Sequence, residues 1–318
     1  MARPIIAVTD SPFQNLDAAK LALGRLKPDL RMAKSASAED IAEVARDADA
    51  VLVADAKLAG PVIRQFTRCK VIGRLGLDAA NIDLPAALAM SITVTAVPDY
   101  CVREVSDHTM ALLLALVRKI PLSNGFAQSG CWDAAAVAPI PRLAGRVLGL
   151  VGFGAIARQV VSKAKAFGLR VVAYDPYVPQ DVIRSAGVEG LSINQLLAMS
   201  DFVSIHAPLA PPIRGLFGTD TFRKMKKGAM VVNTAQGLLI DEAALAAALD
   251  SGQLAGAALD VLATEPPAQD SPLLGRDNVI LTPHSGFYSM DAIEELQNKC
   301  ASDIVRVLSG EAPIYPVK

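Results

Sequence analysis

The stretch that decides the fold runs from Arg146 to Asp175 and reads RVLGLVGFGAIARQVVSKAKAFGLRVVAYD. A short apolar run leads into a G-x-G-x-x-A pattern, and the residues after it repeat apolar side chains at helical spacing. A second apolar run then ends at Asp175. This order of strand, glycine-rich turn, helix and strand predicts one complete βαβ unit.

The glycine-rich turn suits a dinucleotide. Gly152 permits the tight turn, and Gly154 lets a pyrophosphate approach the backbone at the N-terminus of the helix. Asp175 follows Gly154 by 21 residues, where its carboxylate can accept hydrogen bonds from the adenosine ribose. We therefore predict NAD rather than NADP, because a carboxylate repels a 2′-phosphate. Two nearby basic residues, Arg158 and Arg170, keep NADP open as the alternative.

Composition narrows the classes of function. The chain has 318 residues, 52% of them hydrophobic, and a formal net charge of −1, which suggests about two domains. Near-neutral charge argues against nucleic acid or an anionic membrane as the main partner. The four cysteines lack disulfide or metal-ligand spacing, so we expect reduced thiols, no metal and a cytoplasmic location. We expect neither a signal peptide nor a membrane span, because the apolar runs are short.

Alternating strands and helices are predicted along the whole chain. The first hundred residues contain apolar runs at 4–10, 50–55, 70–76 and 91–97, with helical patterns between them. Residues 121–141 are rich in proline and glycine and predict either an irregular arm over a neighbouring surface or a long surface loop. Ligands of parallel sheets bind beyond the carboxyl ends of the strands. We expect one cleft there, lined by the strand-end residues Asp175, His206, Thr234, Asp260 and His284.

The three histidines are the candidates for proton transfer near neutral pH. His108 lies in an apolar helical pattern, which favours a packed or capping side chain. His206, close to Pro208, suits contact with a cofactor. His284 ends the last predicted strand and is the best candidate acid/base. Glu265 could hydrogen-bond and orient its imidazole, although a glutamate before two prolines is often only solvated.

The series of motifs as a whole resembles the D-isomer-specific 2-hydroxyacid dehydrogenase family, which includes phosphoglycerate, glyoxylate and D-lactate dehydrogenases. Within the family it is most similar to the C-terminal-binding-protein-like branch. The motifs occur in order over essentially the whole chain: VIGRLG, NID, VPDYCVREVSDH, GFGAIA, YDP, LLAMSDFVSIHAPL, MKKGAMVVNTAQG, DEAAL, SGQLAGAALDV, EPP and NVILTPH.

The resemblance implies an α/β fold of two doubly wound parallel-sheet domains, usually in a homodimer. A Rossmann NAD-binding domain at residues 99–286 would be inserted in a flavodoxin-like substrate domain formed by residues 1–98 and 287–318. The resemblance also implies that His284 is the acid/base, that Glu265 is its partner and that Asp260 binds the nicotinamide carboxamide. The other implied cofactor-binding residues are Gly152, Phe153, Gly154, Ala155, Ile156, Asp175, His206, Pro208, Thr234, Ala235 and Gly286.

Four departures from the family pattern affect substrate and cofactor recognition. The family sequence N-T-A-R-G appears as NTAQG, so Gln236 replaces the arginine that normally holds the substrate carboxylate. Asp78 replaces a glycine in the loop whose backbone N–H groups, at Leu77 and Asp78, we assign with Arg74 to substrate binding. The other two departures lie near the cofactor, at Ala155 and Ile213.

Two functions follow from these residues. The first is an NAD-dependent oxidoreductase that interconverts a 2-oxo acid and a D-2-hydroxy acid, with the site assembled as the domains close. The loss of one positive charge and the gain of a negative one point to a neutral or cationic substrate, or to lost catalysis. The alternative is an NAD(H)-binding sensor or interaction protein with little turnover. The expected partner is a small molecule, not nucleic acid or membrane.

Overall fold

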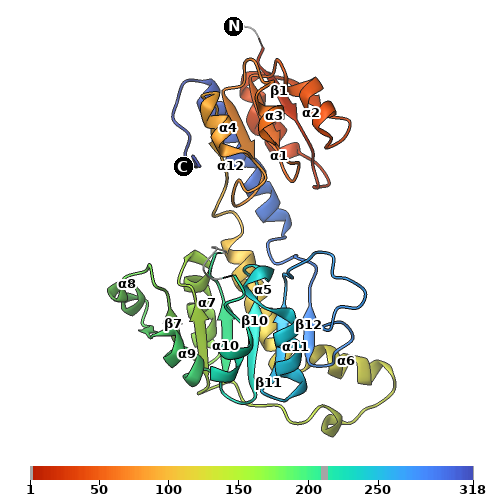
Figure 1. Ribbon diagram of the computed structural model, residues 1–318, viewed down its shortest axis with the longest axis vertical. Helices are drawn as coiled ribbons and strands as arrows, with labels where there is room; N and C mark the ends of the chain where they lie inside the picture. Colours follow the sequence, from red (N-terminus) through yellow and green to blue (C-terminus); the bar gives the residue numbers. More distant parts are fainter. Residues whose placement is uncertain (1–2, 209–213, 318) are drawn as a thin grey trace. The chain divides into compact units, whose positions relative to one another are not determined.

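The computed structural model describes residues 3–208 and 214–317 and divides into two compact units (Figure 1). Unit 1 comprises Met1–Cys101 and Tyr288–Lys318, and unit 2 comprises Val102–Phe287. The sequence prediction divides the chain after residues 98 and 286 instead. The departure at Ile213 lies outside the described residues.

Unit 1 is built on a parallel sheet whose described strands follow the order β2-β1-β3-β4-β5, as in flavodoxin-like doubly wound folds. Its strands are β1 (Ile5–Val8), β2 (Asp29–Met32), β3 (Ala50–Val53), β4 (Val71–Arg74) and β5 (Thr93–Thr95). Its helices are α1 (Asp17–Leu23), α2 (Ala38–Ala45), α3 (Gly60–Ile63), α4 (Leu84–Ala89) and α12 (Met290–Leu308). Helix α12 returns the chain to unit 1 and packs on α1 and β4.

Unit 2 is built on a second parallel sheet, with the described strands in the order β12-β11-β10-β9-β6-β7-β8. They are β6 (Val147–Val151), β7 (Arg170–Tyr174), β8 (Glu189–Gly190), β9 (Phe202–Ile205), β10 (Ala229–Asn233), β11 (Leu254–Leu259) and β12 (Val279–Leu281). Counted within the unit this is the Rossmann order 3-2-1-4-5-6 with one strand added at the edge. The order reverses between β6 and β9, so the carboxyl ends of these strands border the crevice where dinucleotides bind.

Helices cover both faces of the unit 2 sheet, which explains its almost continuously apolar strands. Successive residues of β10 separate onto the two faces: Val231 joins the cluster beneath α9 to α11, whereas Met230 and Val232 join the cluster beneath α5 and α7. The helices are α5 (Val102–Val117), α6 (Ile120–Gln128), α7 (Ala155–Ala166), α8 (Gln180–Ser185), α9 (Ile193–Met199), α10 (Thr219–Lys224) and α11 (Glu242–Asp250).

The predicted irregular stretch at 121–141 is wrong for its first part, because α6 occupies it. Pro121 lies in the first turn of this helix, where a missing N–H group costs nothing. A short 3₁₀ turn at Ala134–Val137 follows, and Trp132 between them is 91% exposed. Within the described residues, no single helix meets the length and hydropathy needed to cross a membrane, and only the pair α5 and α6, bent by 58°, does so jointly.

Candidate functional site

The turn after β6 has the form that a pyrophosphate needs. Gly152 has φ +95°, and a Cβ there would lie 2.7 Å from the backbone of His206 and Ala207, so a side chain is excluded. Gly154 is the N-cap of α7, and a Cβ at that position would meet nothing within 4 Å. The space before the helix N-terminus is therefore open, and its N–H groups suit a dinucleotide pyrophosphate.

Asp175 ties the end of β7 to this turn. Its Oδ2 accepts a hydrogen bond from the Phe153 N–H at 2.8 Å, and its Oδ1 accepts bonds from Tyr177 N at 2.8 Å and Val178 N at 3.2 Å. Each carboxylate oxygen has two lone-pair sites, so one site on Oδ2 remains for a ribose hydroxyl. The carboxylate thus lies where the cofactor's ribose is expected.

The two arginines that kept NADP open both have protein partners. Arg170 begins β7 and forms an ion pair of 2.6 Å with Glu189. It lies roughly 16 Å from Asp175 along the strand, at about 3.3 Å per residue. The Arg158 Nε donates to Phe153 O at 3.2 Å, and its guanidinium stacks over the Phe153 ring. The arrangement favours NAD.

His206 follows β9 and faces the glycine-rich turn with its backbone. Its Nε2 lies 2.9 Å from Ser204 Oγ, and burial lowers its pKa to about 4. The imidazole is therefore neutral near pH 7, which suits contact with a cofactor and not proton donation. The next predicted cofactor residue, Pro208, is exposed.

The turn after β10 carries three predicted site residues. Asn233 closes it, because its Nδ2 donates to Gln236 O at 2.9 Å and its Oδ1 accepts from Ala235 N at 3.0 Å. The Thr234 hydroxyl lies 2.8 Å from the hydroxyl of Thr109 on α5. The Thr234 hydroxyl is therefore hydrogen-bonded within the protein, whereas the Gln236 side chain is exposed.

The predicted acid/base and its partner are in direct contact. His284 Nδ1 lies 2.7 Å from Glu265 Oε2, although 19 residues separate them. The other oxygen, Oε1, accepts from Leu262 N at 2.9 Å, so Glu265 is ordered by the protein and the expectation of a merely solvated glutamate is wrong. With Nδ1 bound to the carboxylate, Nε2 is the nitrogen that can exchange a proton with a substrate.

Asp260 lies at the end of β11, only 3% exposed. Burial by itself raises the pKa of Asp260, but hydrogen bonds from His108, Thr282 and two backbone N–H groups outweigh it and lower that pKa to about 2. Sequence reasoning placed His108 among packed residues, yet its Nε2 lies 3.2 Å from Asp260 Oδ1. The signal that could have found it is a run of polar residues, 106 to 109, within an apolar helix.

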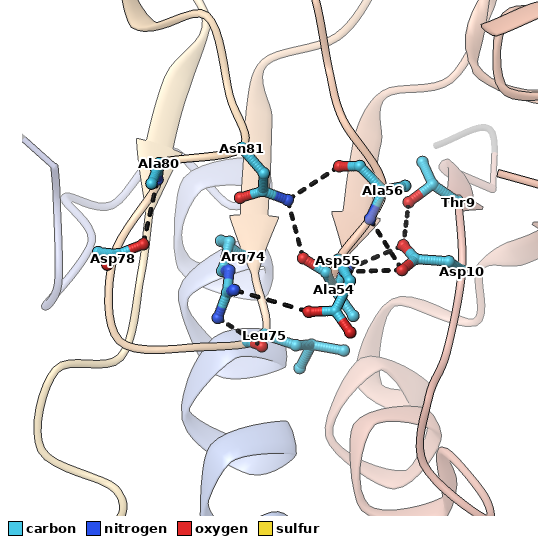
Figure 2. A network of polar contacts seen from close by, with 10 residues as sticks. All are labelled: Thr9, Asp10, Ala54, Asp55, Ala56, Arg74, Leu75, Asp78, Ala80 and Asn81. Atoms are coloured by element: carbon cyan, nitrogen blue, oxygen red, sulfur yellow. Dashed lines mark hydrogen bonds and ion pairs between the residues drawn. The ribbon is translucent and has the colours of Figure 1, made fainter. Parts of the chain in front are cut away.

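The predicted substrate-binding residues of unit 1 surround the end of β4 (Figure 2). The Arg74 Nη1 donates to Leu75 O at 3.0 Å, and Nη2 lies 3.8 Å from Asp55 Oδ1. The guanidinium lies over Gly76, where any Cβ would overlap it. Its Nε is buried and has no partner among the described residues. Arg74 is thus a half-buried cation with few partners.

The loop after Arg74 contains two exposed residues whose backbone N–H groups have no acceptor in the described chain. Leu77 and Asp78 are exposed, and within the described chain their N–H groups donate to no protein acceptor. Asp78 Oδ1 accepts from Ala80 N at 3.1 Å (Figure 2). Successive N–H groups without a protein acceptor, in the loop that follows Arg74, suit an anion such as a carboxylate.

Comparison with known proteins places this geometry in a family. Residues 110–286 match the model of the NAD binding domain of D-isomer specific 2-hydroxyacid dehydrogenases. The chain is 41% identical over 285 residues to D-3-phosphoglycerate dehydrogenase of Methanocaldococcus jannaschii, covering 89% of this chain and 54% of that protein. It spans about half the length of the curated relatives that it matches.

Two solved structures resemble nearly the whole chain. A putative D-isomer specific 2-hydroxyacid dehydrogenase from a Polaromonas species aligns with a TM-score of 0.88 and 27% identity, over 99% of both chains. D-lactate dehydrogenase from Aquifex aeolicus, complexed with NAD and lactic acid, aligns with a TM-score of 0.84 and 25% identity, over 96% of both chains. The likeness extends to both parallel-sheet units.

Proposed function

The chain belongs to the D-isomer-specific 2-hydroxyacid dehydrogenase family, and on that premise we propose that it is an NAD-dependent oxidoreductase with altered substrate recognition. It would interconvert a 2-oxo acid and a D-2-hydroxy acid. The observation that carries the proposal is the contact of His284 with Glu265 at 2.7 Å, in the unit that presents an open pyrophosphate turn.

The chain's own residues supply binding and proton transfer. Gly154, the first turn of α7 and Asp175 would hold NAD, which supplies or accepts the hydride when bound. Glu265 accepts a hydrogen bond from the Nδ1–H group of His284 and so orients the ring with Nε2 outward. During reduction the protonated imidazole gives its Nε2 proton to the carbonyl oxygen of the substrate. During oxidation the neutral imidazole accepts the proton of the substrate hydroxyl at Nε2.

We assign the substrate carboxylate to Arg74 and the N–H groups of Leu77 and Asp78. The half-buried guanidinium of Arg74 supports this, because charge-assisted bonds from its Nη atoms to a carboxylate are about twice as strong as neutral hydrogen bonds. Gln236 retains an amide donor but brings no positive charge. Arg74 is then the cation that binds the substrate, in place of the arginine that the family carries at position 236.

The charges around Arg74 limit what else the substrate carries. Two exposed carboxylates belong to the loops at this end of the sheet: Asp55 after β3, 3.8 Å from Arg74, and Asp78 after β4. Two unit charges 4 Å apart interact by about 1 kcal/mol in water and about 4 kcal/mol near a protein surface. A phosphate would be repelled here, so we propose a substrate with a neutral or cationic side chain, unlike the phosphorylated acid in the relatives' names.

A second candidate is an NAD(H)-binding sensor with little turnover, and Gln236 is the residue that favours it.

We further propose a cytoplasmic homodimer. Three of the four cysteine side chains are buried, and the four form no disulfide in the described chain, which suits a reducing compartment. Light scattering after size-exclusion chromatography will check the dimer.

The test is NADH oxidation by wild type and Gln236→Arg with 2-oxo acids bearing small, aromatic, cationic and phosphorylated side chains. We expect wild type to turn over a neutral or cationic acid with a kcat/KM at least tenfold above the phosphorylated one. Gln236→Arg should shift the preference toward simple and anionic acids, because it restores a positive charge.

The matched control is His284→Ala, which should abolish turnover while leaving NADH affinity within a few-fold. Undiminished turnover in this variant would remove His284 as the acid/base. NADH binding by wild type without oxidation by any acid would favour the sensor. In that case a tenfold or larger gain in Gln236→Arg would identify a catalytic site that has lost its activity.

A further inference from the structure

The turn that carries His284 has an unfavourable backbone conformation. His284 has φ +51°, in the left-handed region that non-glycine residues rarely adopt. Its N–H group lies 2.9 Å from both Asp260 O and Thr282 O. Such a conformation is unfavourable for a residue with a side chain and persists only where the surroundings hold it.

A single buried carboxylate holds the residues on both sides of His284. Asp260 Oδ1 accepts from the Thr282 hydroxyl at 2.6 Å and from Ser285 N at 2.9 Å, and Oδ2 accepts from Gly286 N at 2.9 Å. The turn is thereby tied at its start and at its end to the strand beside it. The position of the imidazole depends on this carboxylate.

His108 also contacts this carboxylate, at the same oxygen as Thr282. Its Nε2 lies 3.0 Å from Thr282 Oγ1 and 3.2 Å from Asp260 Oδ1. Because the Thr282 hydroxyl donates to Asp260, the proton between His108 and this pair belongs to His108 Nε2. A Cβ at Gly286 would lie 3.1 Å from the His108 ring, so the turn packs directly on the imidazole.

We infer that His108 and Thr282 are positioning residues for His284 and act through the Asp260 carboxylate. They orient that carboxylate toward the N–H groups of the turn, and the turn sets the direction of the His284 ring. The inference rests on the proposed function in taking His284 as the acid/base. It adds α5 to the elements that determine the geometry of proton transfer.

Paired variants separate the hydrogen bonds from side-chain volume. Thr282→Val removes the hydroxyl at nearly constant side-chain shape, and Thr282→Ser keeps the hydroxyl. His108→Leu removes the ring N–H donor, and His108→Gln replaces it with an amide N–H donor. Thr282→Val and His108→Leu should lower kcat at least tenfold, with the Kd of NADH and the KM of the acid within threefold of wild type. Misorientation of an acid/base affects the transition state more than ground-state binding.

The conservative variants should recover most of the lost kcat. The matched control is Asp107→Asn, next to His108 on α5, because Asp107 is exposed and pairs with Lys163 at 2.6 Å. It should behave as wild type. If Thr282→Val and His108→Leu weaken NADH binding and leave kcat unchanged, the network belongs to the cofactor subsite and the inference is wrong. Unchanged kinetics throughout would also overturn it.

A second readout does not depend on turnover. The chain has three histidines, so their side-chain NMR signals can be assigned by single substitutions. The His284 Nδ1 proton, bonded to Glu265, should give a downfield resonance in wild type, Thr282→Ser and Asp107→Asn. It should shift or vanish in Thr282→Val and His108→Leu. An unchanged resonance in these two would refute positioning, whereas a wild type without turnover would refute the proposed function instead.

Discussion

Asp175 orders the glycine-rich turn, and we propose that the same side chain recognises the adenosine ribose. Its carboxylate binds the N–H group of Phe153 in the glycine-rich turn and two N–H groups beyond β7, so it shapes the surface that the adenosine end of NAD would contact. It also places negative charge where NADPH carries its 2′-phosphate. Substitutions of Asp175 can therefore separate the effect of its negative charge from the effect of its hydrogen bonds.

Asp175→Ala should weaken NADH binding at least tenfold and relax discrimination against NADPH, because both the ribose acceptor and the repulsive charge are lost. Asp175→Asn should keep part of the NADH affinity, since one carbonyl oxygen still accepts hydrogen bonds. Fluorescence titration with both cofactors gives the ratio of the two affinities. An unchanged ratio in both variants would contradict the ribose assignment.

At the scale of elements, the loop after β3 is clamped from two sides (Figure 2). Asp10, at the end of β1, accepts from the N–H groups of Ala54, Asp55 and Ala56 at 2.7–3.0 Å. Asn81 Nδ2 donates to the carbonyls of Ala54 and Ala56 at 2.9 and 2.8 Å. The clamp sets the position of Asp55, which is the ion-pair partner of Arg74.

Asp10→Ala should destabilise unit 1 by about 2 kcal/mol, because three N–H groups lose a charged acceptor and water satisfies them only in part. The KM for the 2-oxo acid should rise at least threefold, because the side chains of Asp55 and Arg74 are held less firmly in position. The Kd of NADH should not change. Thermal unfolding and steady-state kinetics measure both effects. Asp17→Ala, which removes an exposed ion pair of 3.7 Å with Lys20, is the control and should change neither.

At the scale of the whole molecule, unit 2 contains titratable groups that make its stability fall in acid. Burial lowers the pKa of His206 from 6.5 to about 4, so the folded chain keeps this imidazole neutral. The unfolded chain takes up the proton below about pH 6.5, and the free energy of unfolding therefore falls as pH drops from 6.5 to 4. Asp260, with its pKa near 2, adds a further loss only below pH 4.

The expected loss from His206 is up to about 3 kcal/mol between pH 6.5 and pH 4, at 1.36 kcal/mol per pKa unit. Urea unfolding at a series of pH values measures it, and His206→Gln should flatten the curve over this range. A slope that survives the substitution would assign the acid sensitivity to other groups. His108→Gln provides the comparison for loss of a histidine elsewhere in the unit.

Local sequence patterns were enough to predict the elements and their class. Helix α9, for example, begins with a capping box between Ser192 and Gln195, which is a local sequence signal for the start of a helix. The inner strands of both sheets and the βαβ turn were also predicted, because burial on both faces leaves continuous apolar runs. The edge strands β2 and β8 were not predicted, because they are short and partly exposed and so carry no apolar run. The irregular stretch predicted from residue 121 was wrong at its start. Pro121 was interpreted as a turn residue because prolines and glycines follow it, but it lies in the first turn of α6.

The sequence by itself determined two parallel α/β sheets, the dinucleotide turn and the strand-end residues, because these depend on periodicity and spacing within a few dozen residues. Only the tertiary structure decided which side chains meet. His108 and Thr282 are 174 residues apart, and they touch because α5 packs on β11 and β12. Likewise Arg74 turned out to have few partners and Arg170 to lie far from the ribose, since strand order and direction determine such distances.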